Sequence, residues 1–488
     1  MTGKLYINGE WKEGGGELFG SFNPANFERI WEGRAATGVD IDNVMEAARV
    51  ALQGWALLPL TQRIKHLQTF QSIIEKRKEA LAVTLAQETG KVLWDARTEI
   101  AAMVAKLGFC LKAYEERTGE KFGEGQGFKT ALRHRPHGVV AVFGPYNFPA
   151  HLPNGHILPA LLAGNCVVFK PSELTPLVAE KTLECWHDAG LPPGVINLVQ
   201  GERDTGRLLA AHPGLDGLFF TGSSDTGKIL SKQFAETPDK ILALELGGNN
   251  PLVVHEVGDV KAAVYWTIMS AYHTTGQRCT CARRLIVPHG KSNDAYIEAL
   301  VAAVKTIKAG TYNETPEAYM GPLISNHEAE KLLGAQTGFV AEGGKMLVEM
   351  KRLRDGLPFV SAGLIDVTAV KNRPDKEWFG PLLQLIRVRD MGDAIEEANN
   401  SQYGLSSGIF TDSREHYERF LRHVRAGVVN WNRPLTGSSA NLPFGGVGLS
   451  GNHRPAAYYA ADYCSYPVAS NEAEKIVIPA QLSPGLTL

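Results

Sequence analysis

From Val139 onward, short runs of consecutive apolar residues alternate with longer amphipathic segments. The apolar runs are Val139–Phe143, Cys166–Phe169, Val195–Val199, Gly217–Phe220 and Ile241–Leu244, with helical patterns between them at 152–162, 176–189, 205–211 and 225–234. Unbroken apolar strands are typical of a parallel sheet buried on both faces. Each repeat of about 22–29 residues has the size of a strand–helix unit. The pattern predicts a doubly wound α/β domain whose ligands bind at the carboxyl ends of the strands.

Two further regions extend this prediction along the 488-residue chain. Apolar residues recur at helical spacing from Asp40 to about Glu116, with Gly90 as a candidate helix cap. After Gly248, a second alternating series of helices and strands continues to about Asn430. Since a domain usually holds roughly 100–200 residues, two to four domains are expected.

Two segments have the pattern of exposed strands. The stretch 130–136 mixes charged and neutral residues after a glycine-rich joint at 123–127, and the tail at 463–478 holds short apolar runs. Exposed strands often pair with another chain. We therefore expect these segments to take part in oligomerisation.

Composition excludes several classes of partner. Apolar residues make up 44% and charged residues 21% of the chain, and the net charge of -2 gives no reason to expect nucleic acid or a membrane surface. The segment Met1–Tyr6 lacks an apolar signal region, and no apolar run approaches the roughly 18 residues of a membrane span. Six cysteines do not make a disulfide framework, so a reducing cytoplasm is the simplest compartment.

The stretch Gly276–Cys281 is the first candidate for chemistry. A glycine lets the backbone turn sharply before Cys279, and Arg278 beside it is expected to favour the thiolate, the nucleophilic form of cysteine. Taken alone, Cys279 could equally be a small core residue, or half of a metal site with Cys281. The other four cysteines are scattered without a Cys-x-x-Cys pattern or a nearby histidine pair, so no metal site is expected.

Polar side chains follow four of the five predicted strands of the first α/β domain. They are Asn147, Lys170 with Glu173, Thr221-Gly222-Ser223, and Glu245. Each alone could be a turn residue or a solvated charge. By the strand-end rule, however, all four groups should meet in one crevice.

The segment Gly222-Ser223-Ser224-Asp225-Thr226-Gly227 opens a predicted helix and could cradle a diphosphate, because free N–H groups at a helix N-terminus bind anions. A formal Gly-x-Gly-x-x-Gly match occurs at Gly446, Gly448 and Gly451. It follows a loop rather than a strand, and Pro455 blocks a proper helix after it, so we reject it.

These motifs together resemble the NAD(P)-dependent aldehyde dehydrogenases over essentially the whole chain. The matching segments are Pro145–Pro149, Lys170–Glu173, Phe220–Ser223, Leu244–Gly248, Gly276–Cys279, Glu377–Pro381 and Pro443–Gly446, with Tyr146 in place of the usual tryptophan. The resemblance implies two doubly wound α/β domains plus a β-ribbon for oligomerisation. It assigns 1–124 and 146–248 to a NAD-binding domain, 249–445 to a catalytic domain, and 125–145 with 460–480 to the ribbon and tail. A homodimer or a dimer of dimers is then expected.

The resemblance also implies roles for site residues. Cys279 would attack the aldehyde carbon, Asn147 and the Cys279 backbone N–H would hold the oxyanion, and Glu245 would activate water against the thioester. Lys170 and Glu173 would bind the adenosine ribose, and Glu377 would bind the nicotinamide ribose, with Phe379 beside it. A carboxylate such as Glu173 near the ribose argues for NAD over NADP, because it would repel a 2′-phosphate.

The expected substrate is an acidic semialdehyde. The segments 154–160, 247–251, 279–284 and 451–455 are similar to those of family members that oxidise a dicarboxylic semialdehyde in bacterial arginine catabolism. Gly155 matches a tunnel position where members for small aldehydes often carry a bulky aromatic. We expect Arg433 to anchor a substrate carboxylate, because its planar fork suits one. The further residues expected along the substrate tunnel are His151, Ser439 and Phe444.

Three alternatives stay open from the sequence. The enzyme could act on another semialdehyde or an aliphatic aldehyde. The chain could be a non-catalytic relative, against which the intact set of Cys279, Glu245 and Asn147 argues. It could also be a cofactor-free thiol esterase, which would leave the nucleotide-cradle motifs without a use.

Overall fold

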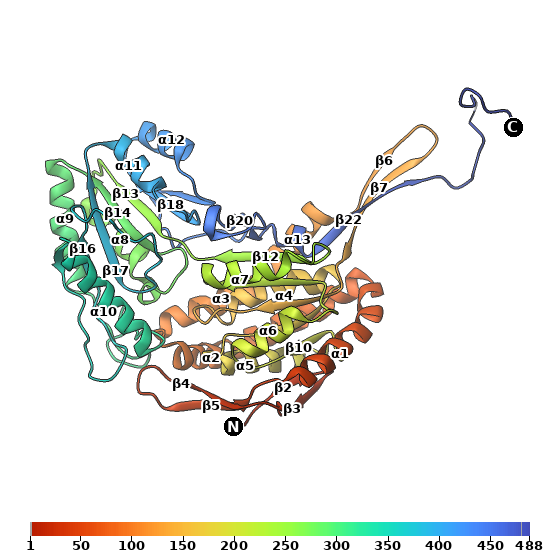
Figure 1. Cartoon of the computed structure of the whole chain (residues 1–488), viewed down its shortest axis with the longest axis horizontal. Helices are drawn as coiled ribbons and strands as arrows, with labels where there is room; N and C mark the ends of the chain where they lie inside the picture. Colours follow the sequence, from red (N-terminus) through yellow and green to blue (C-terminus); the bar gives the residue numbers. More distant parts are fainter. Residues whose placement is uncertain (1, 480) are drawn as a thin grey trace.

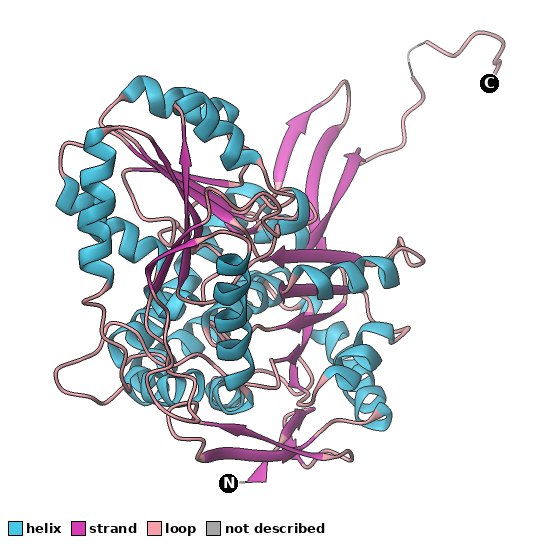
Figure 2. Cartoon of the chain, turned by 60° about the vertical axis from the view of Figure 1, so that its left-hand side comes forward, coloured by secondary structure: helices cyan, strands magenta, loops and turns pink. Residues whose placement is uncertain are grey.

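The computed structural model describes residues 2–479 and 481–488. The chain forms two open sheets flanked by helices, and a ribbon of three strands projects from the body (Figures 1 and 2). The two-sheet α/β architecture agrees with the sequence prediction.

The first sheet contains five parallel strands and an antiparallel edge. Its strands are β2 (Leu5–Ile7), β3 (Glu10–Lys12), β8 (Val139–Phe143), β9 (Cys166–Lys170), β10 (Ile196–Leu198), β11 (Gly217–Gly222) and β12 (Ile241–Leu246), in the order β12-β11-β8-β9-β10-β2-β3. Every residue of β8, β9 and β10 is buried, as a sheet covered on both faces requires. The β2–β3 hairpin turns through Asn8 and Gly9, both with positive φ.

Helices cover both faces of this sheet. They are α1 (Gly38–Leu57), α2 (Leu60–Thr89), α3 (Leu93–Ala113), α4 (His151–Ala163), α5 (Pro176–Asp188), α6 (Arg203–Ala211) and α7 (Ser224–Phe234), and a π-helical turn follows α3 at Tyr114–Thr118. Thr37 and Asp40 form a capping box at the start of α1, and Gly90 ends α2 in the left-handed conformation, as predicted. Helix α3 packs against both α2 and α4, which gives it a central position in the first domain.

The second sheet repeats this plan. Its strands are β13 (Asn250–Val254), β14 (Ala282–Pro288), β15 (Lys345–Val348), β16 (Gly363–Asp366), β17 (Leu382–Val388), β18 (Ser406–Phe410) and β19 (Val428–Trp431), in the order β15-β16-β17-β14-β13-β18-β19. Its helices are α8 (Val260–Ala271), α9 (Lys291–Val304), α10 (Asn326–Ala341), α11 (Met391–Asn399) and α12 (Arg414–His423), with a short 3-10 turn at His273–Gly276 before the cysteine loop.

The projecting ribbon consists of β6 (Lys121–Glu124), β7 (Lys129–Pro136) and β22 (Ser465–Glu472), in the order β22-β7-β6. The glycine-rich stretch 123–127, expected to be a flexible joint, instead belongs to the hairpin that joins β6 to β7. The interval 125–145 also includes β8, which lies inside the first sheet rather than in the ribbon. Its consecutive buried residues place it there, because a ribbon strand exposes alternate side chains.

Smaller elements complete the fold. They are the N-terminal sheet of β1 (Thr2–Gly3), β4 (Leu18–Phe22) and β5 (Arg29–Arg34), the pair β20 (Pro443–Phe444) and β21 (Ala456–Ala457), the 3-10 turn Gly448–Ser450, and α13 (Ala460–Tyr463). Across 2–479 and 481–488, every helix is too short or too polar to cross a bilayer.

Candidate active site

A single cavity of about 1140 Å³ collects the predicted strand-end residues. Both halves of the chain line it: Asn147 follows β8 and Glu245 lies in β12 of the first sheet, and Cys279 precedes β14 of the second. The predicted site residues along its wall are Asn147, His151, Gly155, Lys170, Glu173, Gly222, Ser223, Ser224, Asp225, Thr226, Glu245, Cys279, Glu377, Phe379, Ser439 and Phe444. Two predicted residues, Gly227 and Arg433, lie outside it.

The loop that carries Cys279 is held by its backbone carbonyls. Asn250 Nδ2 donates to the carbonyls of Cys279 (2.7 Å) and Cys281 (3.0 Å), and Arg283 donates to those of Gly276 (2.6 Å) and Arg278 (2.8 Å). Gly276 has φ +70°, and a Cβ there would collide with the backbone of Gly380. These contacts place Cys279 on the cavity wall and leave Cys281 fully buried.

Burial, together with the nearby charges of Glu377 and Glu245, raises the pKa of the Cys279 thiol to about 12. The expectation that Arg278 favours the thiolate is wrong. Its guanidinium turns away to Asp95, with 2.8 Å between Nη2 and Oδ1. At neutral pH the Cys279 thiol is therefore protonated in the free protein.

Asn147 lies beside the cysteine loop. Its Nδ2 donates to the carbonyl of Gln277 across 2.9 Å, and its side chain is buried. A side-chain amide carries two N–H groups, so one remains for an oxyanion in the cavity. The next residue, Phe148, packs its ring against the ammonium of Lys91 (3.5 Å) and the guanidinium of Arg278 (4.9 Å).

Glu245 occupies the end of β12, as predicted. The Ala456 N–H donates to its carboxyl group, Oε2 is buried with no partner among the described residues, and burial raises the pKa well above the ordinary value. A Cβ on Gly445 would stand 2.6 Å from Oε1 of Glu245. This close approach explains why the Pro443–Gly446 motif needs glycine at position 445.

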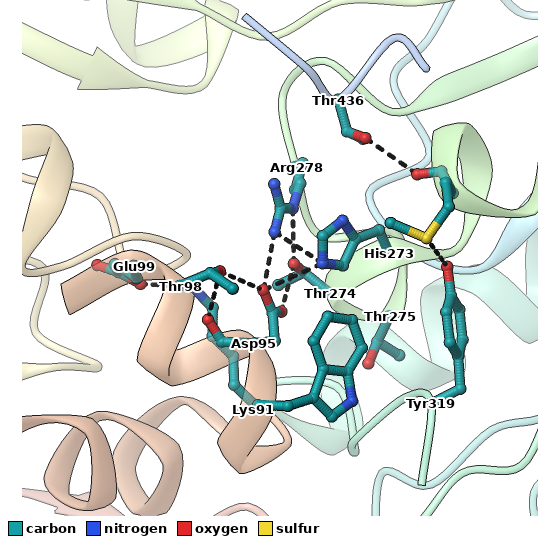
Figure 3. A network of polar contacts seen from close by, with 12 residues as sticks. Lys91, Asp95, Thr98, Glu99, His273, Thr274, Thr275, Arg278, Tyr319 and Thr436 are labelled. Carbon is teal, nitrogen blue, oxygen red and sulfur yellow. Dashed lines mark hydrogen bonds and ion pairs between the residues drawn. The ribbon is translucent and has the colours of Figure 1, made fainter. Parts of the chain in front are cut away.

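A buried polar network on α3 positions both halves of the site (Figure 3). Asp95 accepts hydrogen bonds from Thr274 Oγ1 (2.6 Å) and Arg278 Nη2 (2.8 Å), which ties the cysteine loop to the first domain. Four residues further along, Glu99 accepts from Lys91 Nζ (2.5 Å).

The other oxygen of Glu99 accepts from the backbone N–H groups of Ala150 and His151, each across 3.0 Å, at the start of α4. Sequence analysis missed Asp95, Glu99 and Asn250. For the first two, the available signal was a pair of acidic residues four positions apart on the buried face of α3, among mostly apolar neighbours.

The opposite end of the cavity has the character of a nucleotide site. Lys170 is buried near Glu173 and Glu202, and its Nζ donates to the Pro171 carbonyl across 3.0 Å. Ser223 caps α7 by accepting from the Thr226 N–H (3.2 Å), so the remaining N–H groups of the first turn are available to an anion. Gly227 instead lets α7 pack closely, since a Cβ there would lie 2.6 Å from Leu246 Cδ1.

Glu377 is buried close to the cysteine loop. The Gly248 N–H donates to its carboxyl group, and burial raises its pKa to about 7. Its Oε1 has no hydrogen-bond partner among the described residues, although Arg283 Nη2 lies 3.6 Å away. An unpaired acceptor of this kind fits the hydroxyl groups of a ribose, so the residues present fit a nicotinamide cofactor. Phe379, as predicted, also lines this part of the cavity.

The prediction for Arg433 finds no support. Arg433 is exposed on its loop and lies outside the cavity. The other candidate anchors, Arg283, Arg284 and Arg454, also lie outside the cavity. Arg283 and Arg284 are committed to backbone carbonyls and to the carboxylates of Glu377 and Glu397. A cationic residue that the sequence analysis missed, Lys106 of α3, lines the cavity together with His151 and Gly155.

One group of three potential metal ligands occurs among the described residues. The ligand atoms of His255, Glu256 and His416 lie within 4.8 Å of one another. None of these residues lines the cavity, so they are separate from the candidate site.

Comparison with known proteins defines the class. A profile of the aldehyde dehydrogenase family matches residues 11–467, and the chain belongs to this family. It is 55% identical over 484 residues to N-succinylglutamate 5-semialdehyde dehydrogenase from Chromobacterium violaceum, and the match covers 99% of each chain.

Solved structures agree on the fold. An aldehyde dehydrogenase from Bacillus cereus superposes with a TM-score of 0.91 at 30% identity, covering 97% of both chains. A 1-pyrroline-5-carboxylate dehydrogenase superposes with a TM-score of 0.90 at 29% identity, covering 96% of this chain and 93% of the other. The expected family and the α/β fold with two parallel-sheet domains are confirmed.

Proposed function

We propose that this enzyme oxidises N-succinylglutamate 5-semialdehyde to N-succinylglutamate in arginine catabolism, with NAD as the electron acceptor. The relative from Chromobacterium violaceum supports this substrate, since 55% identity extends over the full length. The observation that carries the chemistry is the meeting of Cys279, Asn147 and Glu245 on one cavity. At Gly155 the same cavity has no side chain to shorten it, which suits a long substrate.

The reaction begins when Cys279 Sγ attacks the aldehyde carbon, while its proton leaves for solvent or a nearby carboxylate. Asn147 Nδ2 and the Cys279 N–H donate to the resulting oxyanion, and one such donor is typically worth roughly 3–4 kcal/mol. A nicotinamide cofactor held by residues such as Lys170, Glu173 and Glu377 would supply the hydride acceptor, and loss of the hydride leaves a thioester on Cys279. Glu245 then takes a proton from water as the water attacks the thioester, and release of the acid restores the thiol.

NAD is proposed over NADP because two carboxylates, Glu173 and Glu202, lie near Lys170 at the nucleotide end of the cavity. A 2′-phosphate in this region would meet their negative charge. Comparing kcat/KM for the two cofactors in the wild type and in Glu173→Gln tests the idea. The substitution should favour NADP, and an unchanged ratio would contradict a role for Glu173.

The function is tested by following the absorbance of reduced cofactor with NAD and a panel of aldehydes. The panel contains N-succinylglutamate 5-semialdehyde, succinic semialdehyde and propanal. Preference for another member would reassign the substrate. Ester hydrolysis without any reduction of cofactor would indicate a thiol esterase, and inactivity with the whole panel would indicate a non-catalytic relative.

We also propose that the enzyme acts in the cytoplasm as a homodimer or a dimer of dimers. All six cysteines are free thiols, which suits a reducing compartment. The ribbon exposes Phe122 and Tyr466 at 62% and 43%, and its edge strand β6 has an unpaired side, which suits pairing with a second copy. A stable monomer measured by light scattering would contradict the proposed dimer or dimer of dimers.

A further inference from the structure

Lys106 is a buried cation in the cavity wall. Ala102, Lys106 and Phe109 of α3 all line the cavity. They are four and three residues apart, the spacing that places side chains on one face of a helix. The Lys106 side chain has 6% exposure. Among the residues that the structure describes, no carboxylate lies within 4.0 Å of its ammonium group.

Within the described part of the chain, the one side-chain polar contact of the ammonium is with a neutral group. Lys106 Nζ lies 3.3 Å from Nε2 of His151, whose pKa is lowered well below its ordinary value by burial and by the charges of Lys106, Lys91 and Arg278. The imidazole is therefore uncharged and accepts the hydrogen bond. It orients the ammonium without compensating its charge, and a buried charge without compensation is costly.

The space beside this cation is open because residue 155 has no side chain. A Cβ on Gly155 would stand 3.7 Å from Lys106 Nζ, and no other atom lies within 4 Å of that position. Any larger side chain at 155 would extend into the region next to the ammonium. The absent side chain and the buried charge therefore create one feature, a small space that contains an unpaired positive group.

The other cations of the cavity come from different elements. Lys170 is the last residue of β9, and Lys376 directly precedes Glu377. Arg203 and Arg207 belong to α6, and Lys331 belongs to α10. Of the described Lys and Arg side chains that line the cavity, Lys106 alone comes from α3, on the side formed by α4 and β21.

We propose that Lys106 and Gly155 form a carboxylate-binding subsite, in which the ammonium pairs with an acid group of the substrate while the aldehyde lies at Cys279. This rests on the proposed oxidation of an acidic semialdehyde. The anchor takes the place that sequence analysis gave to Arg433. A carboxylate completes the ion pair that the protein leaves open, so the subsite selects aldehydes that carry an acid group.

The direct test compares Lys106→Met with the wild type on two substrates of the same length, the acidic semialdehyde and its dimethyl ester. Loss of a charge-assisted hydrogen bond should raise KM for the acid by about ten- to a hundredfold with kcat nearly unchanged. The diester should react equally well with both proteins. The matched control is Lys112→Met, on the same helix but 52% exposed, which should change neither KM.

Two further measurements separate a subsite from a structural role. Lys106→Arg keeps the charge and should restore most of the preference for the acid. Calorimetric binding of the product N-succinylglutamate should weaken in Lys106→Met, while NAD affinity stays the same and the melting temperature does not fall, because a costly buried charge has been removed. An equal loss on acid and diester, or no loss on either, would overturn the subsite. A wild type that oxidises the diester or propanal but rejects the acid would instead overturn the proposed function.

Discussion

Arg278 Nη2 donates to Oδ1 of Asp95 across 2.8 Å, so the arginine next to the nucleophile serves the architecture of the loop rather than the charge of the thiol. Asp95 also accepts from Thr274 and lies 3.2 Å from His273 Nε2. These positive and polar neighbours hold the pKa of the Asp95 carboxyl far below its usual range despite its burial.

Asp95→Asn should therefore leave Arg278 without its counter-ion. Breaking a buried pair of this kind typically costs about 3–5 kcal/mol. We expect a lower melting temperature and a weaker hold on the Cys279 loop. Thermal melting and kcat measure both effects, with Asp42→Asn as an exposed control. Wild-type stability in Asp95→Asn would show that the pair does not support the loop.

The Cys279 thiol should react slowly with iodoacetamide when no cofactor is bound. Burial raises its pKa to about 12, so the thiolate fraction at pH 8 is very small and increases as pH rises. Since the charge of Glu377 contributes to this shift, Glu377→Gln should speed alkylation. Mass spectrometry of the modified peptide, with Cys279→Ala as the control, reports the rate. Rapid alkylation at pH 7 in the wild type would contradict the protonated resting thiol.

Glu245→Gln should slow thioester hydrolysis more than hydride transfer. For Glu245→Gln, the expected stopped-flow trace is a rapid burst of reduced cofactor followed by a slow phase that reports thioester hydrolysis. Because burial raises the Glu245 pKa well above its ordinary value, the carboxylate that acts as base forms only as pH rises through that raised pKa. In the wild type the slow phase should therefore accelerate with pH. Glu245→Gln should lose this dependence, and the same pH profile in both proteins would assign the base elsewhere.

Gly155→Phe should close the cavity to long substrates. The glycine lies within α4, and a Cβ there meets only Lys106 Nζ at an ordinary contact distance, so the backbone should tolerate the change. KM for N-succinylglutamate 5-semialdehyde should rise at least about tenfold, the lower bound for a charge-assisted bond that can no longer form, and propanal should still react. Gly108→Phe, at an exposed helical glycine with open space, is the matched control. Unchanged KM for the long substrate would show that Gly155 does not line its path.

Sequence reasoning worked best where the signal is local. The consecutive apolar runs that became β8, β9 and β10 are visible within a few residues, and the strand-end rule then grouped Asn147 with Glu245. The ribbon was located for a similar reason, although its boundary was placed too late, at 145 instead of Pro136.

What sequence reasoning missed depends on contacts between distant residues. The bond between Thr274 and Asp95 spans 179 positions, and Glu99 reaches Ala150 across 51. No periodicity reveals such partners. Arg433 and Lys106 illustrate the same limit. Only the folded structure shows that Arg433 is exposed on a loop and that Lys106 lines the cavity.

If Lys106 anchors the substrate, its position along α3 sets the distance between the anchor and Cys279. The α3 residues Asp95 and Glu99 hold the loops next to Cys279 and Asn147, and Lys106 lies on the same helix. The helix rises about 1.5 Å per residue, so a cation moved four positions from 106 to the cavity-lining position of Ala102 would shift the anchor by about 6 Å. The position of the cation along α3 would then determine the chain length of the aldehyde acid that the enzyme prefers. A series of ω-aldehyde acids of increasing length, assayed on a Lys106→Ala, Ala102→Lys enzyme, measures that preference.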